Sequence, residues 1–241
     1  MLSHPLRVAD ARRLGVVIAL PAEARSFARA RGPEIELTIV GPGPQRAAAG
    51  AHALIERGVG ALLSWGTSGA LVEDLPAGQL LLGEVLCDAR GEEFASDAAW
   101  LALAARALAP LAPRRARCVT VARPASHLRA KALLARESGC TAVDMESAAV
   151  AAAAARARLP FLAVRSIVDP LDCDLPRCVT TALDPDGRTQ IPRLLAALAR
   201  RPWEIAALLR LAGHFNASLG ALREAARLLA AATPSSLPRP A

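Results

Sequence analysis

The segment Val164-Arg165-Ser166-Ile167-Val168-Asp169-Pro170 carries the interpretation of this chain. The apolar run from residue 160 to residue 168 predicts a buried strand, which ends at an aspartate and a proline. A guanidinium on such a strand is costly unless its charge is paired. The segment therefore predicts a strand that carries either a structural ion pair or a functional carboxylate at its end.

Short apolar runs alternate with helical patterns along the chain on either side of this strand. This alternation favours an α/β fold with a mostly parallel or mixed sheet and helices on both faces. Ligands on such sheets usually bind beyond the carboxyl ends of the strands. Further strands are expected at residues 15–20, 35–40, 60–65, 79–87, 117–121 and 141–144, and helices at 45–57, 97–108 and 145–158.

The last part of the chain differs in character, because residues 190–241 read as helices with a break at Arg201-Pro202 and a Pro/Ser-rich tail. We expect one domain over residues 1–241, with its core at 14–184 and an amphipathic, basic helical extension at 190–232. Such an extension packs on the core or covers a dimer contact; the alternative is a hydrophobic entrance or a membrane-facing patch.

Composition narrows the classes of protein. The net charge is +7 and the pI is about 10.3, but Lys131 is the only lysine, and an arginine bias of this kind does not by itself indicate a nucleic-acid partner. The five cysteines show no CxxC spacing, which indicates a reducing compartment rather than a disulfide framework or a zinc site.

The sequence shows neither a targeting segment nor a motif that binds a metal or cofactor. Residues 1–13 lack the apolar core of a signal peptide, and no uninterrupted apolar stretch predicts a membrane span, so we expect a cytoplasmic protein. The histidines show no metal-ligand spacing, and the sequence has neither a P-loop nor a dinucleotide fingerprint. No metal and no cofactor are implied.

Three other segments place polar groups directly after predicted strands. Glu23, in Ala19-Leu20-Pro21-Ala22-Glu23, taken alone fits an acid that the dipole of a helix start favours. The segment Ser64-Trp65-Gly66-Thr67-Ser68-Gly69-Ala70 is either an ordinary turn or a place where backbone N–H groups approach a ligand. In Ala142-Val143-Asp144-Met145-Glu146-Ser147-Ala148-Ala149, a helix start explains the acids but not the methionine between them.

Together the four segments, in this order over residues 14–175, resemble the nucleosidase branch of the purine nucleoside phosphorylase superfamily, which includes methylthioadenosine/S-adenosylhomocysteine nucleosidase. The resemblance implies a three-layer, phosphorylase-type α/β fold with a mixed central sheet, a homodimer, and cleavage of an N-glycosidic bond.

The resemblance also implies roles for individual residues. Asp169 would protonate purine N7, and Glu23 would position the attacking water with Arg165 nearby. Glu146 would bind the ribose hydroxyls and Met145 would pack against the sugar. Three more residues complete the expected binding set, namely Gly66, Val143 and Asp144, and Thr67 stands where the family has a serine near the leaving group.

This chemistry is physically coherent. The bond breaks through an oxocarbenium-like state, and the base leaves poorly until it is protonated. Asp169 must therefore hold a proton near neutral pH, which requires apolar surroundings or a neighbouring acid. Carboxylates near the sugar stabilise the developing positive charge.

Water is favoured over phosphate as the second substrate, because Glu23 and Ser64 stand where the resemblance implies phosphate-binding arginines in the phosphorylases. Arg25 and Arg46 remain as candidate phosphate ligands, so a phosphate-dependent phosphorylase stays open. A non-catalytic nucleotide-binding module is the remote alternative, in which the ordered carboxylates would have no role.

The expected base pocket departs from the better-known nucleosidases, because residues 122–127 contain no aromatic side chain. His127 either faces this pocket or is a satisfied surface or cap residue. The strand-end motifs together with Pro185-Asp186-Gly187 and the Arg-Arg-Pro extension resemble the hopanoid-associated branch of the superfamily. That resemblance implies release of adenine from adenosylhopane, whose apolar tail would give the extension a purpose at the inner membrane; a methylthioadenosine-type nucleosidase is the alternative.

Overall fold

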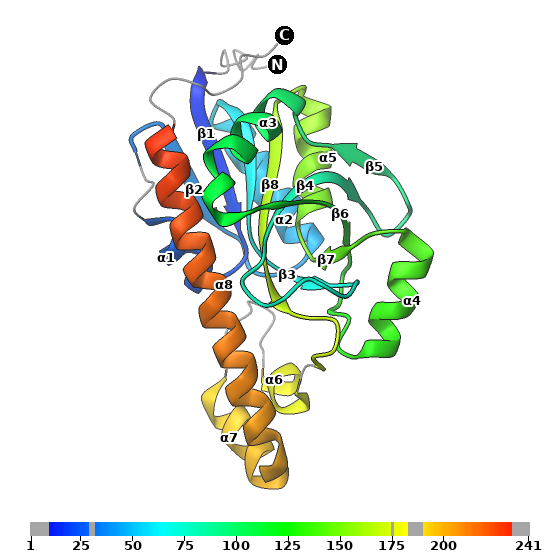
Figure 1. Cartoon of the computed structure of the whole chain (residues 1–241). Coiled ribbons are helices and arrows are strands. Elements are labelled where there is room, and N and C mark those ends of the chain that lie inside the picture. Colours follow the sequence, from blue (N-terminus) through cyan, green and yellow to red (C-terminus); the bar gives the residue numbers. More distant parts are fainter. Residues whose placement is uncertain (1–9, 29–31, 175, 183–189, 233–241) are drawn as a thin grey trace, which may run out of the picture.

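A computed structural model describes residues 10–28, 32–174, 176–182 and 190–232 (Figure 1). The Pro185-Asp186-Gly187 motif lies outside the described residues, and the expectations for residues 1–13 and for the Pro/Ser-rich tail reach beyond them.

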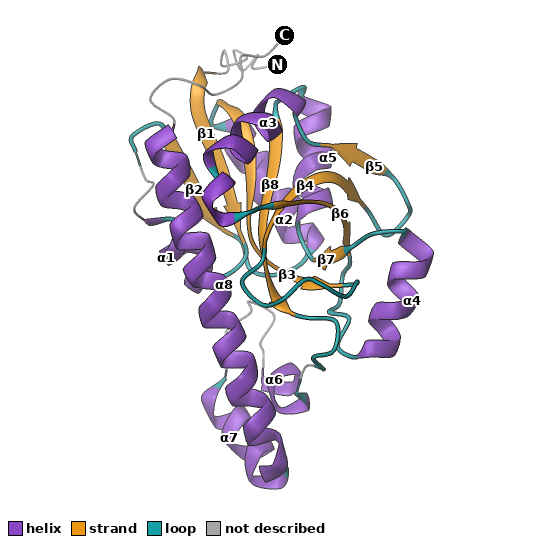
Figure 2. Ribbon diagram, viewed as in Figure 1, coloured by secondary structure: helices purple, strands orange, loops and turns teal. Residues whose placement is uncertain are grey.

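The predicted α/β architecture is confirmed, with a mixed sheet between two layers of helices (Figure 2). The strands are β1 (Asp10–Ile18), β2 (Ile35–Ile39), β3 (Val59–Ala70), β4 (Leu80–Cys87), β5 (Glu93–Ala95), β6 (Arg114–Thr120), β7 (Ala142–Asp144) and β8 (Phe161–Asp169). The helices are α1 (Pro21–Ser26), α2 (Pro44–Glu56), α3 (Ala98–Ala107), α4 (Leu128–Ser138), α5 (Ser147–Ala157), α6 (Arg177–Ala182), α7 (Ile191–Arg200) and α8 (Ile205–Ala232). Sequence patterns did not predict α4, α6 or β5.

The described strands close on themselves over part of the sheet. β8 pairs in parallel with β3 and antiparallel with β4, while β4, β6 and β7 pair in parallel in that order. β7 then returns to pair antiparallel with β3. These five strands form a ring, and β1 and β2 extend it beyond β3 as parallel neighbours.

Of the two interpretations of Gly66-Thr67-Ser68-Gly69, the ordinary turn is wrong, because β3 runs through this segment to Ala70. This part of β3 pairs with β8 and then with β7, so its backbone hydrogen bonds are made within the sheet. Small residues fit where the strands crowd: a Cβ on Gly69 would lie 3.2 Å from Val143 Cγ1. The glycines therefore mark close packing rather than a loop.

Two apolar layers cover the sheet. Side chains from successive positions of β3 enter opposite layers, with Leu62 on the α2 and α5 side and Leu63 on the side of α1, α3 and α8. Burial on both faces explains why the strands read as continuous apolar runs. All five cysteines are buried free thiols.

The predicted C-terminal extension consists of α7 and α8, with a break at Arg201-Pro202 as expected. The C-terminal half of α8 docks on the sheet, where Ser218 donates to the Ile167 carbonyl and Leu222 is fully buried. The other half projects beyond the sheet beside α7 (Figure 1) and exposes Trp203, Ile205 and Leu209 in and just before its first turns.

One helix bears on the expectation that no segment spans a membrane. The stretch Pro202–Ala231 is long and apolar enough to cross a bilayer by length and composition alone. Sequence reading missed it because arginines interrupt the apolar run. Its C-terminal half is docked on the sheet through Leu222, Ala225 and Ala226, so in this fold that half covers the core.

We expect Leu222→Ala to lower the free energy of unfolding by about 2–5 kcal/mol, because it leaves a cavity under α8. The matched change Leu209→Ala on the same helix removes a side chain that is 67% exposed and should cost little. Chemical denaturation of both variants measures the difference. Equal losses would show that α8 is not anchored through its C-terminal half.

Candidate active site

Glu23 lies in the first turn of α1, directly after β1, and is buried. Its Oε1 accepts hydrogen bonds from the backbone N–H and the hydroxyl of Thr67, both at 2.8 Å, and its Oε2 accepts from the Leu20 N–H at 3.0 Å. Burial raises the pKa of Glu23, while Arg165 and the Thr67 bonds oppose that rise. The carboxylate is thus held in one orientation at the end of β1.

Arg165 is almost completely buried in the middle of β8 and pairs with two carboxylates. Its Nε lies 2.9 Å from Asp144 Oδ2, and its Nη2 lies 3.6 Å from Glu146 Oε2. Nη2 also donates to Ser64 Oγ at 2.8 Å and to Ser147 Oγ at 2.9 Å. These contacts satisfy the charge that the sequence placed on an apolar strand, which makes Arg165 the centre of the site.

Asp144 ends β7, and its side chain is inaccessible to solvent. It accepts a hydrogen bond from Thr120 Oγ1 at 2.6 Å and from the backbone N–H of Ser147 at 3.2 Å. These bonds fix the start of α5. In this position Asp144 orients Arg165 and the residues beside it.

Glu146 precedes α5 and accepts a hydrogen bond from the Gly43 N–H at 3.1 Å. Burial raises its pKa to about 7, with repulsion from Asp144 and Glu23 adding to the rise and Arg165 opposing it. Gly43 has a φ of 116°, a backbone conformation that glycine adopts without strain. The Glu146 side chain therefore links the loop after β2 to the loop after β7 by a hydrogen bond.

Asp169 ends β8 and lies beside β3 at Gly69, where an added Cβ would stand 3.4 Å from Asp169 Oδ2. Burial raises its pKa to about 6, and Asp174 and Asp172 add to the rise. The Lys131 ammonium, 2.9 Å from Oδ1, opposes it. Burial, which disfavours the ionised carboxyl, and a cation, which favours it, therefore act on Asp169 together.

Lys131 is the charged residue that sequence reasoning missed. Its side chain is fully buried, although α4 lies far from β8 in the sequence. One feature of the sequence could have drawn attention to this residue, because Lys131 is the only lysine among 29 basic residues.

The remaining predicted residues fall around these groups. A Cβ on Gly66 would lie 2.5 Å from Arg165 Nη1 and 3.0 Å from Glu23 Oε1, so only glycine fits between them. Val143 is buried against Gly69, and Met145 is half-buried.

Three residues that the sequence left open are also placed. His127 caps α4, with Nδ1 accepting from the Ala130 N–H at 3.1 Å, as the cap interpretation expected. Arg25 is exposed at the end of α1, and Arg46 is half-buried in the first turn of α2.

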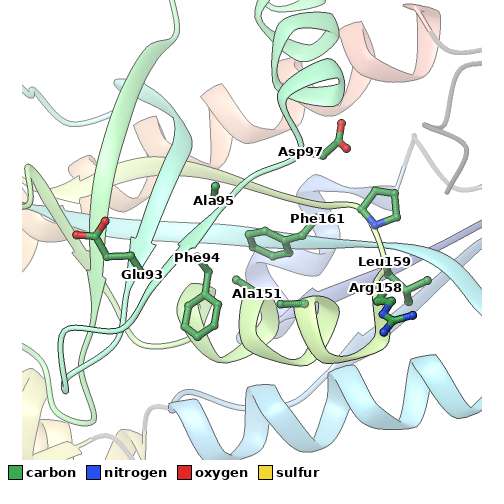
Figure 3. Close-up of a pocket in the computed structure, with 10 residues that line it drawn as sticks. Glu93, Phe94, Ala95, Asp97, Ala151, Arg158, Leu159 and Phe161 are labelled. Carbon is green, nitrogen blue, oxygen red and sulfur yellow. The ribbon is translucent and has the colours of Figure 1, made fainter. Parts of the chain in front are cut away.

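A hollow of about 490 Å³ lies elsewhere, between β5 and α5 (Figure 3). Phe94, Leu159 and Phe161 line it at the beginning of β8, whereas Asp169 stands at the end of that strand. None of the carboxylates described above contributes to its wall. We therefore place the candidate site at the carboxyl ends of β1, β3 and β8 and after β7.

We expect Arg165→Met to destabilise the protein by about 3–5 kcal/mol at pH 8, because buried carboxylates lose their counter-ion. Without Arg165 the folded-state pKa of Glu146 rises further above its unfolded value, so stability is retained at low pH and lost as pH rises. Denaturation at pH 5 and pH 8 should show the larger deficit at pH 8. The control Arg136→Met, on exposed α4, should show little pH dependence.

Solved structures of other proteins share this fold. The futalosine hydrolase of Helicobacter pylori has a similar structure, with a TM-score of 0.70, 16% identity, and coverage of 91% of this chain and 97% of that one. The Neisseria meningitidis 5′-methylthioadenosine/S-adenosylhomocysteine nucleosidase, solved with methylthio-immucillin-A, also gives 0.70 and 16%, covering 91% and 99%. A putative nucleosidase of that type from Francisella philomiragia gives 0.67 and 16%, covering 93% and 100%.

These likenesses establish the fold. No curated protein sequence matches the chain significantly. The family model described as the phosphorylase superfamily matches residues 23–200, which include every carboxylate of the candidate site. This chain therefore belongs to the phosphorylase superfamily.

Proposed function

We propose that this protein is an N-glycosidase that uses water to release adenine from a ribosyl substrate, adenosylhopane. The observation that carries the proposal is the placement of Asp169 and Glu23 along one strand. Asp169 lies beside β3 at Gly69, and Glu23 is bonded to β3 at Thr67. An acid with a raised pKa and a rigidly held carboxylate thus share one wall of the site.

In the proposed reaction Asp169 donates its proton to N7 of the purine. The C1′–N9 bond then breaks, and its electron pair leaves with the base. The water oxygen bonds to C1′ and its proton passes to Glu23, so nucleoside and water become free base and ribosyl product. Glu146 accepts hydrogen bonds from the ribose hydroxyls and, with Glu23, stabilises the positive charge at the sugar.

Hydrolysis is favoured over phosphorolysis by the charges beside the sugar position. The buried cation there, Arg165, is already bound by Asp144, Ser64 and Ser147, and Glu146 lies beside it. Phosphate would also meet the buried Glu23 carboxylate. A polarised water suits this environment better than an anion.

A lipid-linked substrate is supported by the surface around α7 and α8. Trp203 is 71% exposed and Leu209 is 67% exposed, although both are large apolar side chains. Three arginines, Arg193, Arg200 and Arg201, line a hollow of about 450 Å³ beside them. Apolar anchors with adjacent cations are what an anionic bilayer surface attracts.

This surface lies on the same side of the molecule as the end of β8. Glu204 accepts a hydrogen bond from the Cys178 N–H at 2.8 Å, which ties the segment before α8 to the chain that follows Asp169. The proposal therefore places a cytoplasmic, homodimeric enzyme, which needs no cofactor, at the inner membrane. An apolar tail held there would present its adenosyl end to the site.

The activity is tested by adenine release from adenosylhopane in detergent, with and without phosphate. We expect phosphate-independent release, slower by about 10²–10⁴-fold in Asp169→Asn because the leaving group is no longer protonated. The rate should fall as pH rises through the Asp169 pKa of about 6. Asp88→Asn, in the turn after β4, is the matched control. Strict phosphate dependence would establish a phosphorylase, and release only from methylthioadenosine would exclude the lipid substrate.

The membrane contact is tested by sedimentation with phosphatidylglycerol vesicles. We expect the double variant Trp203→Ser, Leu209→Ser to bind at least about 10-fold more weakly than wild type, since it loses both apolar anchors. The control is Leu133→Ser, which removes an exposed apolar side chain from α4. Binding that is equal in the double variant, or equal on neutral phosphatidylcholine vesicles, would contradict the proposed surface.

A further inference from the structure

Lys131 occupies an unusual position for a lysine. Its side chain is fully buried, and its ammonium has three hydrogen-bond acceptors and one ion-pair partner. The acceptors are the carbonyls of Asp169 at 3.5 Å, Pro170 at 2.6 Å and Cys173 at 3.0 Å, and the ion pair joins Nζ to Asp169 Oδ1 at 2.9 Å. Burial of an ammonium is costly, so such a site persists only with complete pairing of this kind.

α4 is attached to the end of β8 at a second point. The Leu128 N–H, at the start of the helix, donates to Asp174 Oδ1 at 2.9 Å. The chain from Asp169 to Asp174 is therefore fixed from α4 at both of its ends. Rotation of the Asp169 carboxyl would break its contact with Lys131 Nζ.

We propose that Lys131 is a positioning residue for the acid, holding Asp169 Oδ1 so that Oδ2 delivers the proton. The inference rests on the proposed function, in which Asp169 is the general acid. Oδ1 is engaged by Lys131, while Oδ2 lies near β3 at Gly69. The two oxygens of one carboxyl group thus have separate roles.

Lys131 also makes the acid stronger. When the proton moves from Oδ2 to the base, Asp169 becomes a carboxylate, and the adjacent ammonium stabilises that product of the transfer. The groups that act on Asp169 are Lys131 from α4, and Asp172, Asp174 and Cys173 from the loop after β8. Burial and both aspartates raise the pKa of Asp169, and Lys131 is the cation that limits the rise.

The pH dependence of the rate distinguishes a positioning role of Lys131 from a role in packing alone. Without Lys131, Asp169 should be a weaker acid that retains its proton to higher pH. We therefore expect Lys131→Met to lower kcat by about 10²-fold with little change in KM, because the acid is misplaced and weakened. The decline of the rate at alkaline pH should begin at a higher pH than in wild type.

The matched control is Arg129→Met, which removes an exposed cation from the same helix. It should leave kcat and the pH profile unchanged. A fall in kcat for Lys131→Met with an unmoved alkaline decline would overturn the proposal, because loss of packing alone lowers the rate without changing the acid.

A second measurement needs no substrate and leaves Lys131 in place. Because the chain has one lysine, growth on [ε-¹³C]lysine labels only Lys131. Its resonance should shift with a midpoint near pH 6, and Asp169→Asn should abolish the step. A step that is absent, or that survives in Asp169→Asn, would overturn the pairing. A normal step in a protein that releases no adenine would instead refute the proposed function alone.

Discussion

The structure depends on one buried cation. Arg165 lies within β8 and is surrounded by Asp144, Glu146, Ser64 and Ser147, which come from β7, the loop after it, β3 and α5. Its charge also opposes the rise in the Glu23 pKa that burial causes. Without this cation the carboxylates on these elements would be buried as unpaired acids. The same contacts therefore link β3, β7 and β8 through side chains and assemble the site.

The ring of five strands explains why the site forms where it does. β3 has β8 and β7 as neighbours at its far end, so Gly66 and Gly69 must accommodate Arg165 and Asp169 at close range. The resulting wall is rigid because its backbone groups are bonded within the sheet. Groups that a mobile loop would hold loosely are thereby fixed for chemistry.

Much of the local structure could be predicted. Apolar runs marked most strands, because burial on both faces of a sheet leaves a continuous signature in each strand. Arg165 and Asp169 stood out because a charge on or at the end of an apolar strand is conspicuous. Glu23, Asp144 and Glu146 were selected through the family resemblance, because a helix start explains each of these acids when it is taken alone. The break at Arg201-Pro202 was also evident, since proline ends a helix locally.

What the sequence determined by itself was the order of elements, the family resemblance and the choice of charged residues, because these depend on neighbours within a few positions. Only the tertiary structure decided that β3 continues through its glycines, that the strands close into a ring, and that the sole lysine meets Asp169. Each of these follows from contacts between segments far apart in the chain. Lys131 and Asp169 are 38 residues apart, and no local periodicity records that a helix on one side of the ring will meet the end of β8.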